Sequence, residues 1–411
     1  MYRDLDIIYF TLFPWDHPYS SVSLSFAKEF SKNNRVFYVN HPYSLKDFAG
    51  NFKTKMAKER RGHLLTNKLR YEQVEGVSEN IIGVHPPLTF PINWMPEGGF
   101  YQTFSAYNNK VILNTIKKII QDYKLNNFIF INCFNPYFAG TLPKDFGQVV
   151  NIYQNIDDMT QEPYTAKHGA RLEREVATKT DIVTVTSTNL WELMSPYNKE
   201  VHIVHNAADI SNFERVLKEK FDKPEEIKHI DGKIIGFVGN LDHCRVDYPL
   251  LQKIAEYHSD KTLLLVGPIN NTEYQEIGLD QLPNVIFAGS KNIAELPRYL
   301  QHMDCTLIPF LCNTLTKSIY PLKINEYLAA GKAVISTSFS KDIRGFADYI
   351  YLADNHDQFL KQIDQAIIEN AAGRIQSRND LAHTNTWEAR VEEFWTIVED
   401  YLMKKKRPQT A

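Results

Sequence analysis

Cysteine is scarce in this sequence, and long apolar runs are missing. The 411 residues include only four cysteines, and none of them forms a CxxC pair. Their irregular spacing argues against a disulfide framework or a structural zinc site, so we expect thiols in a reducing compartment. No apolar run approaches the roughly 20 residues that a transmembrane helix needs. The apolar stretch 7–13 is too short and wrongly flanked for a signal peptide, so we expect a cytoplasmic protein.

A large net charge of either sign is also lacking. The chain has 46 Lys and Arg against 49 Asp and Glu, a formal net charge of −3. No overall field draws such a protein onto nucleic acid, so a small ligand is the better expectation. The basic tail at 404–407 (Lys-Lys-Lys-Arg) is compatible with peripheral contact with an anionic inner membrane. The alternative interpretation is a solvated, disordered chain end.

Signatures of several enzyme classes are absent as well. The sequence contains no GxxxxGK[ST] phosphate loop, no GxSxG elbow and no HExxH metal pair. Nucleotide hydrolysis, serine esterase activity and zinc proteolysis therefore lose their support. GxGxxG is missing too, so a Rossmann-like sheet in this chain does not imply a bound dinucleotide.

The pattern that is present predicts an α/β protein with two domains. Short β-branched and aromatic runs alternate with helical patterns, which is typical of parallel sheets built from βαβ units. In the first half, we expect strands at 7–13, 36–40, 81–84, 128–132, 149–153, 182–186 and 201–204. In the second half, we expect them at 233–238, 262–266, 285–288, 305–309, 333–336 and 349–352. Expected helices include 21–32, 108–123, 166–180, 247–258 and 387–404.

Two features mark the division between the domains. The apolar run from Lys233 ends in Gly239 and Asn240, as the first strand of a new sheet would. The charged stretch 215–231, which contains Pro224, lies before this run and predicts a linker.

The segment 313–337 carries the clearest chemistry. Pro321 suits the first turn of a helix, where its missing N–H would be unpaired anyway. The free N–H groups and the positive dipole end of that turn predict a diphosphate site. Lys323 and Glu326 are three residues apart on one helix face, where one can meet phosphate and the other ribose hydroxyls. The alternative is an ordinary surface ion pair on an amphipathic helix.

With these residues in view, the second half of the chain resembles the GT-B glycosyltransferases. The likeness is carried by Gly-Phe-Val-Gly-Asn at 236–240, Leu-Leu-Val-Gly-Pro at 264–268, the run 282–289, and 323–331. The most similar group is GT4-like and bacterial, and it builds exopolysaccharides and teichuronic acid. The resemblance implies two Rossmann-like domains, an acceptor-binding one at 1–210 and a nucleotide-sugar-binding one at 211–384, that face a central cleft and close over the substrates. A helix within 385–411 would cross back to the N-terminal domain.

The resemblance also implies roles for the donor-binding residues. Glu326 would bind the ribose, and Lys323 and Arg245 would lie near the diphosphate or sugar. The remaining implied donor contacts are backbone positions and glycine turns, namely Gly239, Asn240, Gly267, Gly289, Ser318, Tyr320 and Leu322. Many retaining members carry Glu-x7-Glu, but the position eight residues before Glu326 is Ser318. Retention and inversion therefore both stay open.

In the first half, the resemblance rests on 13–17, on 149–158 and on Glu173. A carboxylate at the carboxyl end of a strand could serve as the base for an acceptor hydroxyl. Asp157 is the first choice and Asp158 the second, and the alternative for both is a turn or capping role. His17 is a further candidate for the base or a substrate contact, or it is simply packed.

These observations predict sugar transfer from a nucleotide sugar, such as a UDP- or GDP-sugar, to a saccharide or lipid-linked acceptor. GT-A enzymes bind Mn²⁺ with an Asp-x-Asp after an internal strand, whereas here Asp4-Leu5-Asp6 precedes the first expected strand. We therefore predict no metal and no other cofactor, with the helix dipole and basic groups stabilising the leaving diphosphate. The alternatives are a nucleotide-sugar epimerase of the same fold and a non-catalytic nucleotide-sugar-binding subunit.

Overall fold

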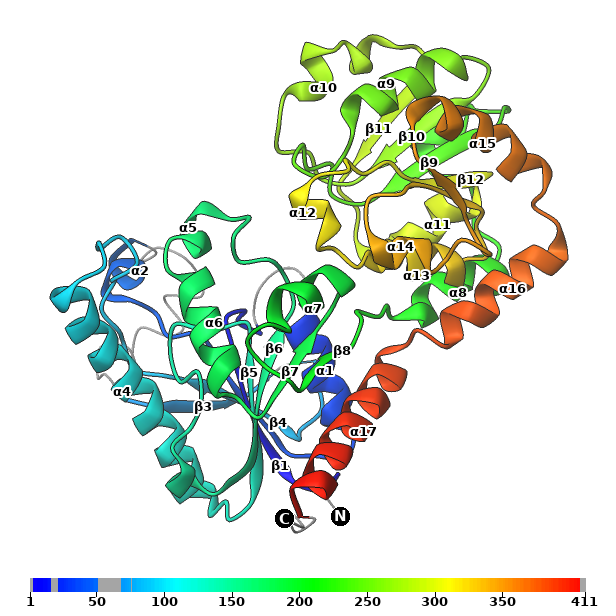
Figure 1. Cartoon of the computed structure of the whole chain (residues 1–411). Helices are drawn as coiled ribbons and strands as arrows, with labels where there is room; N and C mark the ends of the chain where they lie inside the picture. The colour runs from blue at the N-terminus through cyan, green and yellow to red at the C-terminus, as the bar shows by residue number, and fades with distance from the viewer. Residues whose placement is uncertain (1–2, 16–20, 51–67, 75, 407–411) are drawn as a thin grey trace. The chain divides into compact units, whose positions relative to one another are not determined.

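The computed structural model describes residues 3–15, 21–50, 68–74 and 76–406, and the chain divides into two compact units. Unit 1 consists of Met1–Val204 together with Val391–Ala411, and unit 2 is His205–Arg390 (Figure 1). Each unit has its own parallel sheet and its own hydrophobic core. The chain leaves unit 1 once and returns to it within helix α17 (Trp387–Lys406).

Unit 1 is built on an eight-stranded sheet of order β3-β4-β2-β1-β5-β6-β7-β8. Every neighbouring pair is parallel except β3 and β4. Its strands are β1 (Asp6–Thr11), β2 (Val36–Val39), β3 (Arg70–Gln73), β4 (Ile81–His85), β5 (Phe128–Cys133), β6 (Gln148–Asn155), β7 (Ile182–Val185) and β8 (Val201–Ile203). Its helices are α1 (Val22–Phe30), α2 (Leu45–Gly50), α4 (Gly99–Tyr123), α5 (Pro163–Ala166), α6 (Gly169–Lys179) and α7 (Thr188–Met194). Because β2 and β5 flank β1 on opposite sides, the strand order reverses there, and such a switch point is where ligands bind.

Unit 2 has a six-stranded, all-parallel sheet of order β11-β10-β9-β12-β13-β14. Its strands are β9 (Ile234–Val238), β10 (Thr262–Val266), β11 (Val285–Gly289), β12 (Cys305–Ile308), β13 (Val334–Thr337) and β14 (Tyr351–Ala353). Its helices are α8 (Ile210–Lys218), α9 (Tyr248–Tyr257), α10 (Glu273–Glu276), α11 (Leu296–Gln301), α12 (Thr314–Lys317), α13 (Leu322–Ala329), α14 (Lys341–Arg344), α15 (His356–Ile368) and α16 (Ala372–His383). The switch point of this sheet lies between β9 and β12.

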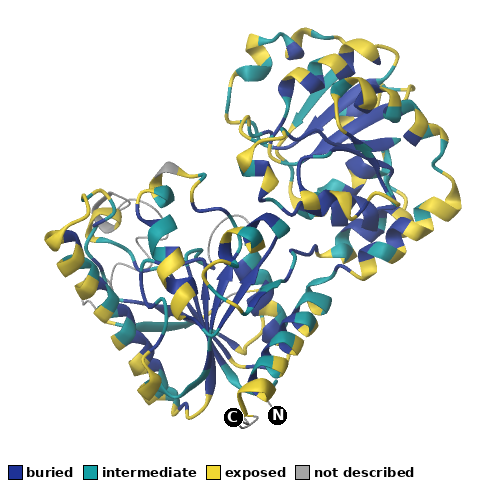
Figure 2. Cartoon of the chain, in the orientation of Figure 1, coloured by how far each residue is buried: buried dark blue, intermediate teal, exposed yellow. Residues whose placement is uncertain are grey.

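Burial explains why most strands could be predicted from the sequence. Strands β1, β2, β5 and β9 consist mainly of buried apolar residues, as the dark strands of Figure 2 show. A parallel sheet covered on both faces requires such continuous apolar runs. All thirteen strands expected from the sequence are present, with boundaries shifted by a few residues.

The differences from the expected elements have physical reasons. The missed strand, β3, is a short, polar, antiparallel edge strand without an apolar run. Helix α4 begins at Gly99, whereas the sequence predicted a start at residue 108. The first two turns were missed because they expose aromatic side chains and lack a clean apolar stripe.

The predicted linker at 215–231 is wrong. Helix α8 and the segment after it belong to unit 2, and their Phe213, Val216 and Ile227 lie in its hydrophobic core. Charge and Pro224 were therefore misleading, since this stretch covers the core with one apolar face and exposes the other. The chain instead leaves unit 1 at Val204.

Helix α17 is anchored to unit 1 by aromatic packing. Phe394 and Trp395 lie with ring centroids 5.1 and 5.9 Å from that of Phe30 in α1. The helix continues to Lys406, and Lys405 Nζ lies 3.5 Å from Asp181 Oδ1. The described part of the basic tail is therefore helical, which corrects the expectation of a disordered end.

None of the described helices combines the length and the apolar character needed to cross a bilayer.

Candidate functional site

Three glycine turns interlock at the carboxyl ends of β9, β10 and β11. The N–H of Gly239 donates to the carbonyl of Val266 at 2.8 Å, and the N–H of Gly267 donates to the carbonyl of Gly289 at 2.9 Å. A Cβ on Gly267 would lie 1.8 Å from the carbonyl oxygen of Gly239, so this approach requires glycine. The structure thus brings together three of the predicted donor residues, Gly239, Gly267 and Gly289. We call these three turns the glycine rim.

Helix α13 begins beside this rim, at the switch point of the sheet. Its N-cap is Pro321, and no side chain caps its first turn. The first N–H groups of any helix have no partner within the helix, and they attract anions. The hydroxyl of Tyr327 accepts a hydrogen bond from the N–H of Val238 at 2.9 Å and donates to its carbonyl at 3.1 Å. These two hydrogen bonds to the last residue of β9 fix the helix against the strand end.

Sequence reasoning does not single out Tyr327. At four residues from Lys323 on an apolar helix, it is indistinguishable from an ordinary core residue. The one available signal is that a buried tyrosine hydroxyl must find a hydrogen-bond partner.

Lys323 reaches directly over the first glycine turn. A Cβ built on Gly239 would lie 1.9 Å from Lys323 Cε and 2.6 Å from Nζ. The ammonium group also lies 5.9 Å from the ring centroid of Phe237. Because Gly239 has no side chain, the cation can sit against the backbone at the end of β9.

Charge at this site is concentrated and poorly hydrated. Burial lowers the pKa of Lys323, and the charge of Arg245 lowers it further, while Glu326 opposes the shift. Burial raises the pKa of Glu326, and Lys323 opposes that shift. A bound diphosphate would favour the charged form of Lys323 and so offset the cost of burying its charge.

Arg245 comes from the turn that follows β9. Its Nε lies 3.6 Å from Asp242 Oδ2, and no hydrogen-bond partner for this buried nitrogen is present among the described residues. The guanidinium influences the pKa of Lys323, so the two cations share one electrostatic environment. Asn240, in the same turn, is exposed.

Two of the predicted donor residues turn their side chains inward. Ser318, at the end of α12, is buried, and Tyr320 stacks on His205 with ring centroids 4.4 Å apart. Only their backbone could meet a diphosphate. Leu322, the first residue of α13, is half-buried.

The carboxyl end of β6 carries the predicted acid pair of unit 1. Asp157 Oδ1 accepts the N–H of Asp158 at 2.8 Å. Asp158 accepts the N–H of Thr160 at 2.9 Å, its hydroxyl at 2.7 Å, and Gln161 Nε2 at 3.1 Å. Asp158 is buried and shapes its own turn, whereas Asp157 is half-exposed. This arrangement favours Asp157 for a chemical role.

Glu173 of α6 lies buried near this acid pair. Its Oε1 accepts hydrogen bonds from Tyr153 Oη at 2.7 Å and Asn155 Nδ2 at 2.9 Å. Burial raises its pKa to about 8, and the charges of Asp158 and Asp157 add to the rise, while the bond from Tyr153 opposes it. At neutral pH, Glu173 is mainly protonated, which limits the negative charge at this strand end.

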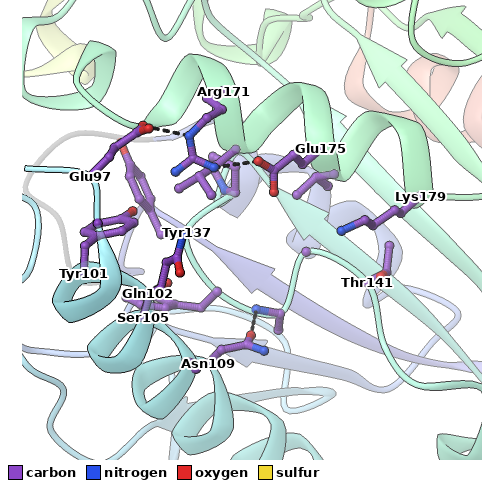
Figure 3. A pocket seen from close by; sticks show the side chains of 18 residues that line it. Glu97, Tyr101, Gln102, Ser105, Asn109, Tyr137, Thr141, Arg171, Glu175 and Lys179 are labelled. Atoms are coloured by element: carbon purple, nitrogen blue, oxygen red, sulfur yellow. Dashed lines mark hydrogen bonds and ion pairs between the residues drawn. The ribbon is translucent and has the colours of Figure 1, made fainter.

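Between α4 and α6, a polar cavity of about 590 Å³ opens in unit 1 (Figure 3). Arg171 crosses its rim and pairs with Glu97 at 2.8 Å and Glu175 at 2.5 Å. Asn109 Oδ1 accepts the N–H of Ala139 at 2.7 Å, which holds the cavity floor. The arginine is thus already neutralised by two carboxylates, so we assign this cavity no charged ligand.

One sequence candidate is not described, and the rejected Asp-x-Asp motif is confirmed to lie away from the site. His17 falls outside the described residues. Asp6 begins β1, at the amino end of the sheet, where both carboxylate oxygens accept bonds from Arg35 at 2.8 Å. Among the described residues, Asp242, His243 and Cys244 form one cluster of possible metal ligands, largely exposed. Exposed clusters of this kind are common without a metal, and the prediction of no metal stays a prediction.

Comparison with known proteins bears on the unit that carries the glycine rim. Residues 232–369 match the family model described as Glycosyl transferases group 1. The matched segment lies within unit 2. It runs from β9 through α15 and includes the interlocked glycines, Lys323 and Glu326.

A curated relative adds to this match. The chain is 26% identical over 226 residues to TuaH of Bacillus subtilis (strain 168), described as a teichuronic acid biosynthesis glycosyltransferase. The alignment covers 52% of this chain and 56% of TuaH, so the match spans just over half of the relative's length.

Solved structures resemble the whole chain. Sucrose-phosphate synthase from Thermosynechococcus elongatus matches with a TM-score of 0.61 at 13% identity, covering 97% of this chain and 100% of that one. A UDP-forming trehalose-phosphate synthase from Burkholderia vietnamiensis matches at 0.67 and 8%, covering 97% and 100%. Anabaena HepE in complex with UDP matches at 0.62 and 12%, covering 96% and 100%. At these identities the likeness shows the fold, and the GT-B fold predicted from the sequence is confirmed.

The glycine rim of unit 2 generates a direct prediction. In Gly239→Ala, the new methyl group would displace Lys323 and strain a backbone with a φ of +156°. We expect the affinity for UDP or GDP, measured by calorimetry, to fall by about tenfold or more. Gly373→Ala is the matched control, because a Cβ there meets nothing within 4 Å, and its affinity should be unchanged. Equal affinities in the two variants would contradict the assigned role of the rim.

The lowered pKa of Lys323 predicts a pH dependence of donor binding. A diphosphate binds the protonated ammonium, and the charged fraction is lost as pH rises through the lowered pKa. Nucleoside diphosphate affinity should therefore begin to weaken in the pH range below the ordinary pKa of a lysine, and Lys323→Met should bind more weakly with a flatter profile. Calorimetric titration of both proteins across this range tests the point. An identical slope in both would exclude Lys323 as the titrating group.

Proposed function

We propose that this protein is a glycosyltransferase that moves a sugar from a nucleotide sugar to a hydroxyl group of an acceptor. The observation that carries the proposal is the coincidence of the group 1 domain match with the glycine rim and the start of α13. Backbone N–H groups, a helix N-terminus and two cations at one strand end form an environment suited to a diphosphate.

The proposed donor is a UDP- or GDP-sugar. Its diphosphate would lie between the rim and α13, near Lys323 and Arg245, while Glu326 would accept the ribose hydroxyls. UDP is the first choice of nucleotide, because the structurally similar HepE was determined in complex with UDP. Gly289, the exposed glycine that ends β11, would flank the base.

On the acceptor side, Asp157 is the proposed base. It stands at a strand's carboxyl end and is half-exposed, whereas the carboxylate of Asp158 is engaged by its own turn. Because Glu173 is mainly protonated at neutral pH, it adds little repulsion against an ionised Asp157. With Ser318 buried where a first glutamate would stand, the stereochemical outcome stays open.

The proposed acceptor is a saccharide or a lipid-linked saccharide in the synthesis of a surface polysaccharide. The description of TuaH supports this direction. We also propose that the protein works in the cytoplasm with peripheral contact to the inner membrane. Lys404 Nζ lies 3.7 Å from Glu200 and Lys405 Nζ lies 3.5 Å from Asp181, so both amines are partly neutralised within unit 1. The helical tail therefore supports membrane contact less than its sequence does.

The two alternatives are less well supported. An epimerase of the same fold would need no acceptor, and neither the family model nor TuaH is described as one. A non-catalytic binding subunit would have no need of a half-exposed carboxylate at the end of β6. Turnover separates the three possibilities.

Paired variants provide the test of the function. Glu326→Ala should weaken UDP or GDP binding by about tenfold, because it removes a charged hydrogen-bond acceptor from the donor site. Asp157→Asn should bind the nucleotide normally and lose turnover by at least about a hundredfold, because it removes the base. Release of the nucleotide from a nucleotide sugar with an extract of lipid-linked saccharides measures the second effect. Equal loss of binding in both variants would show that Asp157 is assigned wrongly.

Metal independence forms a separate prediction. A nucleoside diphosphate should raise the melting temperature by the same amount with and without EDTA, because side chains and the helix terminus replace the cation. Thermal shift assays with UDP, GDP and their sugars measure this. If EDTA abolished the shift, the cluster Asp242, His243 and Cys244 would become the first candidate for a metal site.

A further inference from the structure

A second cavity of unit 1 opens at the ligand-binding edge of its sheet. It encloses about 470 Å³, within the range typical of small-molecule sites. Its lining comes from the segments that follow β1, β2, β4, β5 and β6. These are the carboxyl ends of strands on both sides of the switch point at β1, where α/β sheets bind their ligands.

The wall of this cavity is strongly aromatic. Six aromatic side chains line it: Phe90, Trp94, Tyr101, Tyr137, Phe138 and Tyr164. Trp94 and Tyr164 expose 66% and 68% of their surface, so large apolar faces remain uncovered. Among the described residues of the lining, Lys46 and Asp47 are the only Lys, Arg, Asp or Glu side chains, one of each sign. The cavity therefore suits a neutral ligand with apolar faces.

The loop that bears Trp94 is held in place. Trp94 Nε1 donates to the carbonyl of Pro91 at 2.8 Å, and Asn93 Nδ2 donates to the carbonyl of Tyr164 at 2.7 Å. The tryptophan is thus exposed on an ordered support, which lowers the entropic cost of binding against it.

His41 contributes a hydrogen-bond donor to this cavity. Its Nδ1 lies 3.0 Å from Asn135 Nδ2, which can only donate, so Nδ1 accepts and Nε2 carries the hydrogen. Burial lowers the pKa of His41 to about 4, so the ring is neutral at pH 7. The ring packs on Phe138 at 5.4 Å between centroids. Among the described residues, none hydrogen-bonds to its Nε2.

Asn93 orders the loop beside this cavity. Its Nδ2 is committed to the carbonyl of Tyr164, which fixes the orientation of the amide. Its Oδ1 is buried, and within the described ranges it has no hydrogen-bond partner. Because this oxygen is closed off from solvent, a ligand in the cavity does not reach it, and the role of Asn93 is to hold the loop.

We propose that this cavity binds a neutral pyranose ring of the acceptor, with a ring hydroxyl accepting the hydrogen of His41 Nε2. The apolar C–H faces of the ring lie against the aromatic walls. This inference rests on the proposed function, because only a transferase has an acceptor. Binding of the sugar to the cavity itself requires no nucleotide sugar.

The tautomer of His41 can be observed directly. In protein labelled with ¹⁵N-histidine, two-bond ¹⁵N–¹H spectra at pH 7 should show His41 protonated at Nε2 and unprotonated at Nδ1. Adding methyl or n-octyl pyranosides of glucose, galactose, N-acetylglucosamine and N-acetylgalactosamine should shift the His41 signals for at least one sugar. UDP alone should leave them in place. A proton on Nδ1, or no shift with any pyranoside, would overturn the proposal.

Variants separate hydrogen bonding from packing. Asn135→Asp places an obligate acceptor beside Nδ1, which moves the hydrogen there and should raise the dissociation constant for the bound pyranoside about tenfold. Asn93→Asp replaces the amide donor, so it should disturb the Trp94 loop. His202→Gln is the control, because four strands separate β8, which carries His202, from β2 in the sheet, and His202 pairs with Glu200. It should bind normally.

The remaining outcomes are also decisive. If n-octanol shifts His41 as strongly as the octyl pyranosides while methyl pyranosides do nothing, the cavity accepts an alkyl chain and the sugar assignment is wrong. If pyranosides bind as expected but no nucleotide changes the melting temperature, the cavity stands and the proposed transferase function fails. Thermal unfolding of each variant identifies any that do not fold.

Discussion

The proposed donor site depends on the absence of a side chain at Gly239. The cation of Lys323 lies where a Cβ would be, and the carbonyl of the same glycine lies where a Cβ on Gly267 would be. One residue thus allows both the close approach of a charge and the close approach of a neighbouring turn. Tyr327 then holds the helix and the strand end at that spacing. Loss of any one contact would disturb the other two.

Much of the fold could be predicted from the sequence because buried parallel strands require apolar runs. Strands such as β5 and β10 are buried along their whole length, so their residues carry the signal themselves. The polar edge strand β3 and the amphipathic helix α8 carry no such signal. Their positions depend on tertiary contacts that local pattern does not reveal.

The site was only partly predictable for a similar reason. Lys323, Glu326 and the glycines could be named because a helix start and glycine turns have local signatures. Tyr320 stacks on His205, and the hydroxyl of Tyr327 makes two hydrogen bonds to Val238. Both contacts join residues that are far apart in the sequence. His41 was missed altogether, since a lone histidine after a strand acquires meaning only beside Asn135 and the aromatic wall.

The return of the chain to unit 1 has a consequence for synthesis on the ribosome. Phe30 lies in the first helix, and its partners Phe394 and Trp395 lie in the last. Unit 2 is therefore translated in full before unit 1 can bury that aromatic cluster. Until then, Phe30 and its neighbours stay exposed to solvent and to other nascent chains, a state that favours aggregation or chaperone binding. Within this protein, the unit made first is the one completed last.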